Sequence, residues 1–284
     1  MKAAMSEAPL TSLPRVAFVG GGNMARSLIG GLVRQGTAPD HITVAEPNAE
    51  LRAALVRDFG VTAHADGVTA AAGADVVVLA VKPQVMRAVC ESLRPVMQGG
   101  HVLLLSIAAG IRMEQLDHWC GGNLAVVRSM PNTPALIGAG ASGLCANARA
   151  TAEQRRAAQT ILAAAGVVVW IDDEAQMDIV TALSGSGPAY FFLLAEALED
   201  AAVAQGLPRD AARLLAAQTA LGAGRMLRED GETAAVLRQR VTSPGGTTQA
   251  ALDRFAAHGL REVVADAVAA ATERGRELAA RSGD

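Results

Sequence analysis

The sequence predicts an α/β N-terminal domain, a Rossmann-like doubly wound parallel sheet, followed by an all-α C-terminal domain. Up to Asp172, short and almost continuously apolar segments alternate with segments of helical periodicity. That pattern is typical of parallel strands that crossover helices bury on both faces. After Asp172 every apolar segment has helical spacing. We therefore expect a flexible N-terminal extension at residues 1–14, an α/β domain at 15–172 and a helical domain at 173–284.

The expected strands are short apolar runs bounded by Gly, Pro or polar residues, and the expected helices repeat apolar residues every three to four positions. Gly36 ends the first helix as a C-cap. In order, the strands are 16–20, 42–45, 76–81, 102–107, 124–129, 143–145 and 167–171, with helices at 24–35, 49–59, 84–97 and 153–164.

The second half is Ala-rich, and its helices are expected at 176–183, 189–205, 209–227, 233–240, 249–257 and 261–280. Small residues recur along one of them, at Ala216, Ala220, Ala223 and Gly224. Such a stripe allows two helices to approach closely, either within one chain or across a dimer.

Composition excludes several classes of protein. The 284 residues are 51% hydrophobic and 19% charged, with net charge −3 and no Lys/Arg run, which argues against disorder and against nucleic-acid binding. Cys90, Cys120 and Cys145 lack ligand spacing, so we expect free buried thiols and no metal site. With no secretory signal and no apolar run of about 18 residues, the expected location is cytoplasmic, without a membrane partner.

A glycine fingerprint follows the first expected strand and opens the first helix. Gly20 permits a tight turn, Gly22 lets a pyrophosphate approach the backbone, and Ala25 lets helix and strand pack closely. Asn23 and Met24 complete the G-x-G-x-x-A pattern. The alternative is a glycine turn without a ligand; the fingerprint predicts a dinucleotide site.

Glu46 ends the second expected strand, about 20 residues after the fingerprint, where an acidic residue meets the adenosine ribose. A carboxylate there accepts from both ribose hydroxyls of NADH and repels the 2′-phosphate of NADPH. Asn48 and Arg52 lie near enough in sequence to leave NADPH open. The cofactor is therefore NADH or NADPH, with NADH slightly favoured; the alternative for Glu46 is a solvated loop carboxylate.

Two further loops follow strands at the same edge of the sheet. In the loop Ala80, Val81, Lys82 and Pro83, the proline stiffens the turn so that backbone groups can face the nicotinamide half. Lys82 either faces a phosphate or is solvated. Asn132 stands between two prolines as a fixed amide, suited to the cofactor's carboxamide or to substrate, or else forms a plain Asx turn.

The run Ser243-Pro-Gly245-Gly246-Thr247-Thr248 directly precedes a helix. The first N–H groups of a helix lack internal partners, and the positive end of its dipole attracts anions. With two hydroxyls beside them, these backbone groups predict a carboxylate or phosphate site.

A helix is expected to break at Ser184–Gly187 and to restart at Pro188, because proline is tolerated in a first turn. The break frees backbone donors and hydroxyls, which favours a binding site, with a simple inter-helix turn as the alternative.

Taken together, these segments resemble the pyrroline-5-carboxylate reductase family over about residues 15–280. The resemblance is carried by VAFVGGGNMA (16–25), AVKPQ (80–84), SIAAGI (106–111), RSMPNTPALIGAG (128–140), LSGSGPAY (183–190) and VTSPGGTTQAALD (241–253). Glu46 departs from NADP-preferring members, which often carry a small hydroxyl residue there.

The resemblance implies reduction of L-1-pyrroline-5-carboxylate to L-proline by hydride transfer from NAD(P)H. It implies that Thr181 hydrogen-bonds the ring nitrogen and relays its proton, while Ser243 to Thr248 hold the substrate carboxylate. Glu196 is a second polar contact or a solvated residue. The resemblance also implies a dimer with exchanged helical halves, which makes residues 173–284 a dimerisation and substrate-binding domain, and a further assembly of dimers.

Other functions remain open from the sequence. A reductase of a related cyclic imino acid would use the same plan. A 3-hydroxyacid dehydrogenase would need a catalytic lysine in the linking helix, and no Lys follows Lys82. A non-catalytic NAD(H)-sensing protein is the alternative from another class.

Overall fold

The computed structural model describes residues 13–98 and 101–281. The chain divides into two compact units: a sheet unit, up to Gly185 and again from Ala271, and a helical unit, Ser186–Ala270. The sequence-based boundary after Asp172 thus lies ahead of the point where the units separate. Of the expected extension, residues 1–12 lie outside the described residues, while Leu13 is buried in the core of the sheet unit.

The sheet unit contains an eight-stranded sheet in the order β3-β2-β1-β4-β5-β6-β7-β8. This confirms the doubly wound, predominantly parallel sheet. One pair differs, because β6 and β7 are antiparallel. The nine residues between them cannot hold the crossover of a dozen or more residues that a parallel pair needs. The strands are β1 Val16–Val19, β2 Ile42–Ala45, β3 Thr62–His64, β4 Val76–Leu79, β5 Leu103–Ser106, β6 Ala125–Met130, β7 Gly140–Ala146 and β8 Gly166–Trp170.

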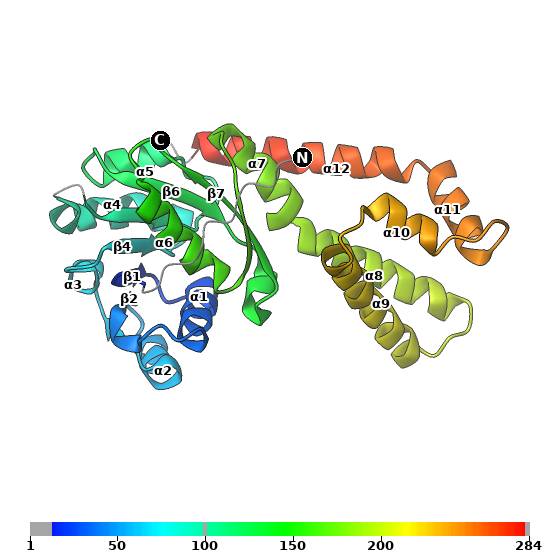
Figure 1. Ribbon diagram of the computed structural model, residues 1–284, viewed down its shortest axis with the longest axis horizontal. Helices are drawn as coiled ribbons and strands as arrows, with labels where there is room; N and C mark the ends of the chain where they lie inside the picture. Colours follow the sequence, from blue (N-terminus) through cyan, green and yellow to red (C-terminus); the bar gives the residue numbers. More distant parts are fainter. Residues whose placement is uncertain (1–12, 99–100, 282–284) are drawn as a thin grey trace. The chain divides into compact units, whose positions relative to one another are not determined.

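Helices cover both faces of the sheet (Figure 1). On one face lie α1 (Asn23–Arg34), α2 (Ala49–Phe59) and α6 (Ala152–Ala163); on the other lie α3 (Gly67–Ala71), α4 (Pro83–Met97) and α5 (Met113–Trp119). The unit also contains short 3-10 turns, among them η1 (Pro39–His41) and η2 (Thr133–Ile137).

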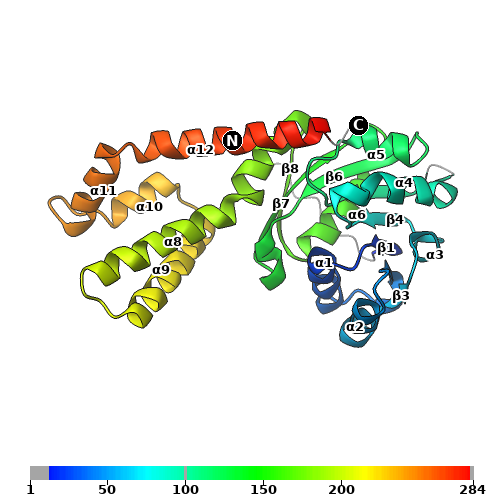
Figure 2. The same ribbon diagram turned by 180° about the vertical axis from the view of Figure 1, so that it is seen from behind.

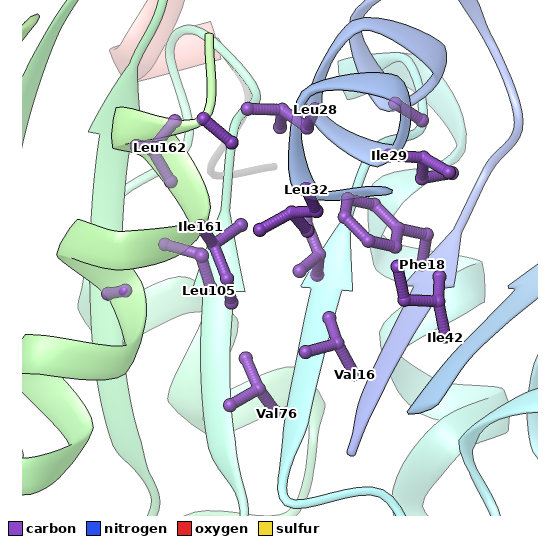
Figure 3. Close-up of a cluster of buried hydrophobic side chains, with 14 of the residues drawn as sticks. Val16, Phe18, Leu28, Ile29, Leu32, Ile42, Val76, Leu105, Ile161 and Leu162 are labelled. Carbon is purple, nitrogen blue, oxygen red and sulfur yellow. The ribbon is translucent and has the colours of Figure 1, made fainter. Parts of the chain in front are cut away.

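The alternation of side chains along each strand builds two cores. In β1, Val16 and Phe18 enter the core under α1 and α6, while Ala17 and Val19 enter the opposite one. Figure 3 shows the first core, where Leu28, Ile29 and Leu32 of α1 lie over the strand residues. Ile161 and Leu162 of the neighbouring α6 enter the same core. This double burial explains why the strands read as continuous apolar runs.

Among the strands and α-helices of the described residues, β3, α3 and α5 have no counterpart in the sequence prediction. β3 has three residues at the edge of the sheet, and all are at least partly exposed, so it lacks an apolar run. The two helices have five and seven residues, too short for a periodic pattern to stand out.

All described secondary structure after Trp170 is helical, as predicted. The sheet unit continues with η3 (Glu174–Gln176), α7 (Met177–Val180) and a π-helical turn, η4 (Thr181–Gly185). The helical unit holds α8 (Gly187–Ala204), α9 (Arg209–Glu229), α10 (Ala234–Arg240), α11 (Thr247–Ala257) and the first turns of α12 (Leu260–Arg281). Helices α8 and α9 pack side by side (Figures 1 and 2).

The helical unit exposes much of its apolar surface. Phe191, Phe192 and Leu193 of α8 are 65–68% exposed, and Leu214 of α9 is 69% exposed. By length and composition alone, the stretch Glu174–Ala204 is apolar enough to cross a membrane. Helices that protein partners bury meet the same criterion. A helix that is apolar on all sides is normally covered by something.

Candidate active site

The glycine loop joins three strands at the point where the strand order reverses. The N–H of Gly20 donates to the carbonyl of Ala45 (2.9 Å), and the N–H of Ala80 donates to that of Val19 (2.8 Å). Gly20 has φ +106°, and a Cβ there would lie 2.6 Å from the Ala80 carbonyl oxygen. Only glycine fits a loop that is both left-handed and this close to its neighbour. Ligands of doubly wound sheets bind at this switch point.

The N-terminus of α1 is left open for an anion. Gly22 is its N-cap, no side chain caps it, and its first turn holds no acidic residue. A Cβ on Gly22 would meet nothing within 4 Å, so the space beside this backbone is free. Ala25 is buried against the sheet, while Asn23 is exposed and Met24 half-buried. This cradle fits the pyrophosphate of a dinucleotide.

Glu46 ties the glycine loop to the loop after β2. Its Oε2 accepts from the N–H of Gly21 (3.1 Å) and its Oε1 from the N–H of Asn48 (2.9 Å). Arg52 donates to the carbonyl oxygens of Glu46 and Pro47, at 2.7 Å each. The half-buried carboxylate is therefore held at the end of β2, beside the cradle.

The loop after β4 lies against the glycine loop through Ala80. Ala80 and Val81 are half-buried, and Pro83 opens α4 in its first turn. Lys82 is the exposed N-cap residue of α4 and makes no side-chain capping bond. Its ammonium group is thus available to a phosphate or to solvent, as the sequence left open.

Asn132 occupies the loop between β6 and β7, and both ends of its amide are engaged by the protein. Its Nδ2 donates to the Ser184 carbonyl (2.9 Å), and its Oδ1 accepts from the N–H of Ala141 (2.8 Å). The side chain therefore links the sheet to η4.

Thr181 is the first residue of η4. Its hydroxyl donates to the carbonyl of Met177 one turn back (2.8 Å), so its oxygen lone pairs remain to accept a hydrogen bond. The expected break at Ser184–Gly187 is instead a widened π-helical turn, after which α8 begins at Gly187 with Pro188 in its first turn. Such turns are frequent at functional sites because they disturb the regular backbone pairing.

A buried ion cluster beneath α7 escaped the sequence analysis. Arg128 is 4% exposed and pairs with Glu174 (3.1 Å) and Asp178 (3.7 Å). Glu174 also accepts from the N–H of Met113 (2.8 Å). Burial, and to a smaller extent the charge of Glu174, raises the pKa of the Cys145 thiol. A charged residue inside an apolar strand was the signal that could have revealed this cluster.

The run Ser243–Thr248 forms a turn before α11. The N–H of Gly246 donates to the Ser243 carbonyl (3.0 Å) around Pro244 and Gly245, whose φ is +71°. Proline followed by a left-handed glycine is a type II turn. The Gly246 N–H is thereby used within the turn. Thr247 and Thr248 begin α11, which has no side-chain cap and no acidic residue in its first turn.

The sequence-predicted residues fall in both units. The sheet unit brings together the glycine loop, Glu46 and the loop at Ala80–Pro83, and it links Asn132 to the turn that begins with Thr181. The helical unit holds the Ser243–Thr248 turn and Glu196, an exposed residue of α8.

Two family models match the chain. A model described as pyrroline-5-carboxylate reductase dimerisation matches residues 174–278, and one described as NADP oxidoreductase, coenzyme F420-dependent, matches residues 15–110. The dimerisation match begins at residue 174, shortly after the last strand ends at Trp170.

Relatives and solved structures extend the match to nearly the whole chain. It is 51% identical to a pyrroline-5-carboxylate reductase of Pseudomonas aeruginosa over 272 residues, 96% of this chain and 99% of the relative. A structure of a pyrroline-5-carboxylate reductase from Coxiella burnetii is 42% identical with TM-score 0.92, covering 94% of this chain and 99% of that one. The Plasmodium falciparum pyrroline carboxylate reductase, solved with NADP bound, is 28% identical with TM-score 0.80, covering 94% and 98%.

Proposed function

The chain belongs to the pyrroline-5-carboxylate reductase family, and from that premise we propose that it reduces L-1-pyrroline-5-carboxylate to L-proline with NADH or NADPH. The observation that carries this function is the pairing of an uncapped helix N-terminus at the sheet's switch point with a hydroxyl-bearing π-helical turn in the same unit.

The cofactor supplies a hydride, which adds to the imine carbon while the former C=N electron pair stays on the ring nitrogen. The chain's residues hold the two reactants. Gly20, Gly22 and Ala25 form the pyrophosphate cradle together with Asn23 and Met24. Glu46 faces the adenosine ribose, and Ala80 to Pro83 line the approach to the nicotinamide half.

Thr181 acts on the ring nitrogen. Because its own proton is bonded to the Met177 carbonyl, its oxygen accepts the N–H of a protonated imine. A protonated imine needs no further acid, since the nitrogen already carries the proton that the product amine retains. Positioning donor and acceptor is then the main task of the protein.

The substrate carboxylate binds at Ser243, Gly245, Gly246, Thr247 and Thr248, where the first N–H groups of α11 and two threonine hydroxyls are available. Glu196 is a second polar contact. We assign residues 15–172 to cofactor binding and 173–284 to dimerisation and substrate binding. The enzyme is proposed to be a cytoplasmic homodimer that can assemble further, with no nucleic-acid or membrane partner.

Oxidation of NADH and of NADPH, followed by absorbance with and without L-1-pyrroline-5-carboxylate, tests the reaction. We expect substrate-dependent oxidation with L-proline as product, and a somewhat higher rate with NADH. A six-membered cyclic imino acid serves as the competing substrate. Cofactor oxidation with that compound alone would reassign the substrate, and no cofactor oxidation with either compound would contradict the function.

A further inference from the structure

We propose that Asn132 is a positioning residue for the reaction: its amide supplies the hydrogen bond that Pro188 cannot give to the Ser184 carbonyl, and so holds the turn bearing Thr181 on the sheet. The importance of Thr181 rests on the proposed function. The role of Asn132 in holding the turn does not.

The missing hydrogen bond follows from the sequence around η4. In an α-helix the carbonyl of Ser184 would accept from the residue four positions on, which is Pro188 and has no N–H. The next candidate, Ala189, directs its N–H to the Ser186 carbonyl (3.0 Å). Leaving a fully buried carbonyl without a donor costs about 1–3 kcal/mol, and the Ser184 carbonyl is partly buried. Asn132 Nδ2 approaches this carbonyl to 2.9 Å.

The amide is well suited to this role because it is held from its other end. Its Oδ1 accepts from the N–H of Ala141 at the start of β7 (2.8 Å), which orients the NH₂ group toward η4. The proline on either side of the loop segment, Pro131 and Pro134, restricts the backbone that carries it. Asparagine offers one acceptor and one donor at the required ends, whereas aspartate offers only acceptors once ionised.

Two packing contacts bring the same turn against the same strands. Met130 and Gly143 are cross-strand partners in β6 and β7. A Cβ on Gly143 would lie 2.6 Å from Val180, and one on Gly185 would lie 2.6 Å from the Met130 methyl group. Close contacts thus flank the turn at Val180 and Gly185, and the Asn132 bond lies between them. Thr181 is enclosed within this segment, so movement of the turn moves its hydroxyl.

Asn147 provides a matched control at the opposite end of the same strand pair. Its Oδ1 accepts from the N–H of Val126 (3.1 Å) and its Nδ2 donates to the Leu124 carbonyl (2.9 Å). Its Oδ1 also accepts from the N–H of Arg149 (3.2 Å). Asn147→Ala therefore removes comparable side-chain hydrogen bonds, one of them to β6, and none of these bonds involves η4.

The first experiment compares Asn132→Ala with Asn147→Ala in steady-state kinetics and in direct NAD(P)H binding. A small displacement of a reacting group can cost up to ~100-fold in rate. We expect Asn132→Ala to lower kcat about ten-fold with an unchanged cofactor Kd, and Asn147→Ala to leave kcat as it is. A cofactor Kd weakened in step with kcat/KM would make Asn132 a cofactor contact and overturn the proposal, as would an unchanged kcat.

The rate of the variant Asn132→Asp should depend on pH in a characteristic way. Ionised aspartate repels the Ser184 carbonyl, but protonated aspartate can donate to it, so the rate of this variant relative to the wild type rises as the pH falls. A pH-independent ratio contradicts the proposal.

In the double variant Asn132→Ala/Pro188→Ala, residue 188 regains an N–H for the Ser184 carbonyl, and we expect part of the lost kcat to return. No recovery would contradict the role of the missing hydrogen bond.

Amide hydrogen exchange of residues 181–189 decides the structural part without any activity. We expect faster exchange there in Asn132→Ala and wild-type exchange in Asn147→Ala. If the wild type fails to reduce the imine, the function falls while faster exchange still supports the role of Asn132. Unchanged exchange would overturn that role even in an active enzyme.

Discussion

The two units of the chain bury apolar side chains to very different degrees. In the sheet unit, residues such as Phe18, Leu28 and Leu105 are fully buried between strands and helices (Figure 3). In the helical unit, Phe191 and Phe192 are mostly exposed, and the only described large apolar side chain there that is buried is Leu237. The sheet unit has a core of its own, whereas the helical unit needs a partner surface, as expected of a dimerisation family.

If the helical unit is covered by a partner, a charge on the exposed face of α8 should disrupt the assembly. Phe192→Asp should dissociate the assembly, because a central interface aromatic commonly contributes about 2–4 kcal/mol, or ~30- to 1,000-fold in affinity. We expect a smaller species by sedimentation and a corresponding loss of turnover. The control is Val56→Asp, a charge on a 47% exposed residue of α2, which should change neither. An unchanged sedimentation coefficient for Phe192→Asp would contradict the prediction.

The sheet unit should respond in the opposite way, through its own stability. Leu105→Ala removes a fully buried side chain from β5 and should lower the free energy of unfolding by about 2–5 kcal/mol, measured by denaturant titration. Ile137→Ala changes an 83% exposed side chain of the same unit and should stay within about 0.5 kcal/mol of wild type. Equal losses in both variants would mean that burial does not decide stability here.

Within the sheet unit, Thr181→Ala tests the hydroxyl itself. A hydrogen bond to a charged group is worth about 1.5–3 kcal/mol, so we expect kcat to fall ~10- to 100-fold with cofactor affinity unchanged. Thr181→Ser keeps the hydroxyl and should retain most of the activity. If the serine and alanine variants were equally impaired, the hydroxyl would not be the acting group.

Substitution of Glu46 should change the preference between NADH and NADPH, with a smaller effect than the Thr181 substitution. Glu46→Ser removes a charge that we expect to oppose a 2′-phosphate. For a water-screened pair this interaction is about 1 kcal/mol, so the NADPH/NADH rate ratio should rise ~3- to 10-fold. Glu46→Gln removes the charge and keeps an acceptor for the Gly21 N–H. A ratio that rises for serine and stays constant for glutamine would point to loop geometry in place of charge.

The last expected effect concerns a thiol in the buried core of the sheet unit at alkaline pH. A hydrogen bond with the Cys90 thiol, together with burial, raises the pKa of the Cys120 thiol well above its usual range. The unfolded chain loses this proton near pH 8.5 while the folded protein keeps it. The contribution of this thiol to the free energy of unfolding is therefore fully present below that pH. It declines above that pH by at most about 1.4 kcal/mol per pH unit. In denaturant titrations at several pH values, Cys120→Ala should show a shallower decline; an identical slope would contradict it.

Much of the fold could be predicted because local pattern and tertiary role agree. The strands at Ile42–Ala45 and Val76–Leu79 are apolar runs that are buried on both faces, and α2 matches its predicted range. Its N-cap Asn48 accepts from the N–H groups of Glu50 and Leu51, and Gly60 ends it in a left-handed conformation. Elements without such signals, such as β3, were missed.

Some parts of the candidate site could likewise be found from the sequence, and others only from the structure. The sequence by itself located the glycine loop before α1, the carboxylate after β2 and the run Ser243–Thr248 before α11, because each depends on residues close together in the chain. Only the tertiary structure showed that Asn132 donates to Ser184, and that Arg128 pairs with Glu174 and Asp178. These contacts join residues 46 to 52 positions apart, so no local periodicity or spacing encodes them.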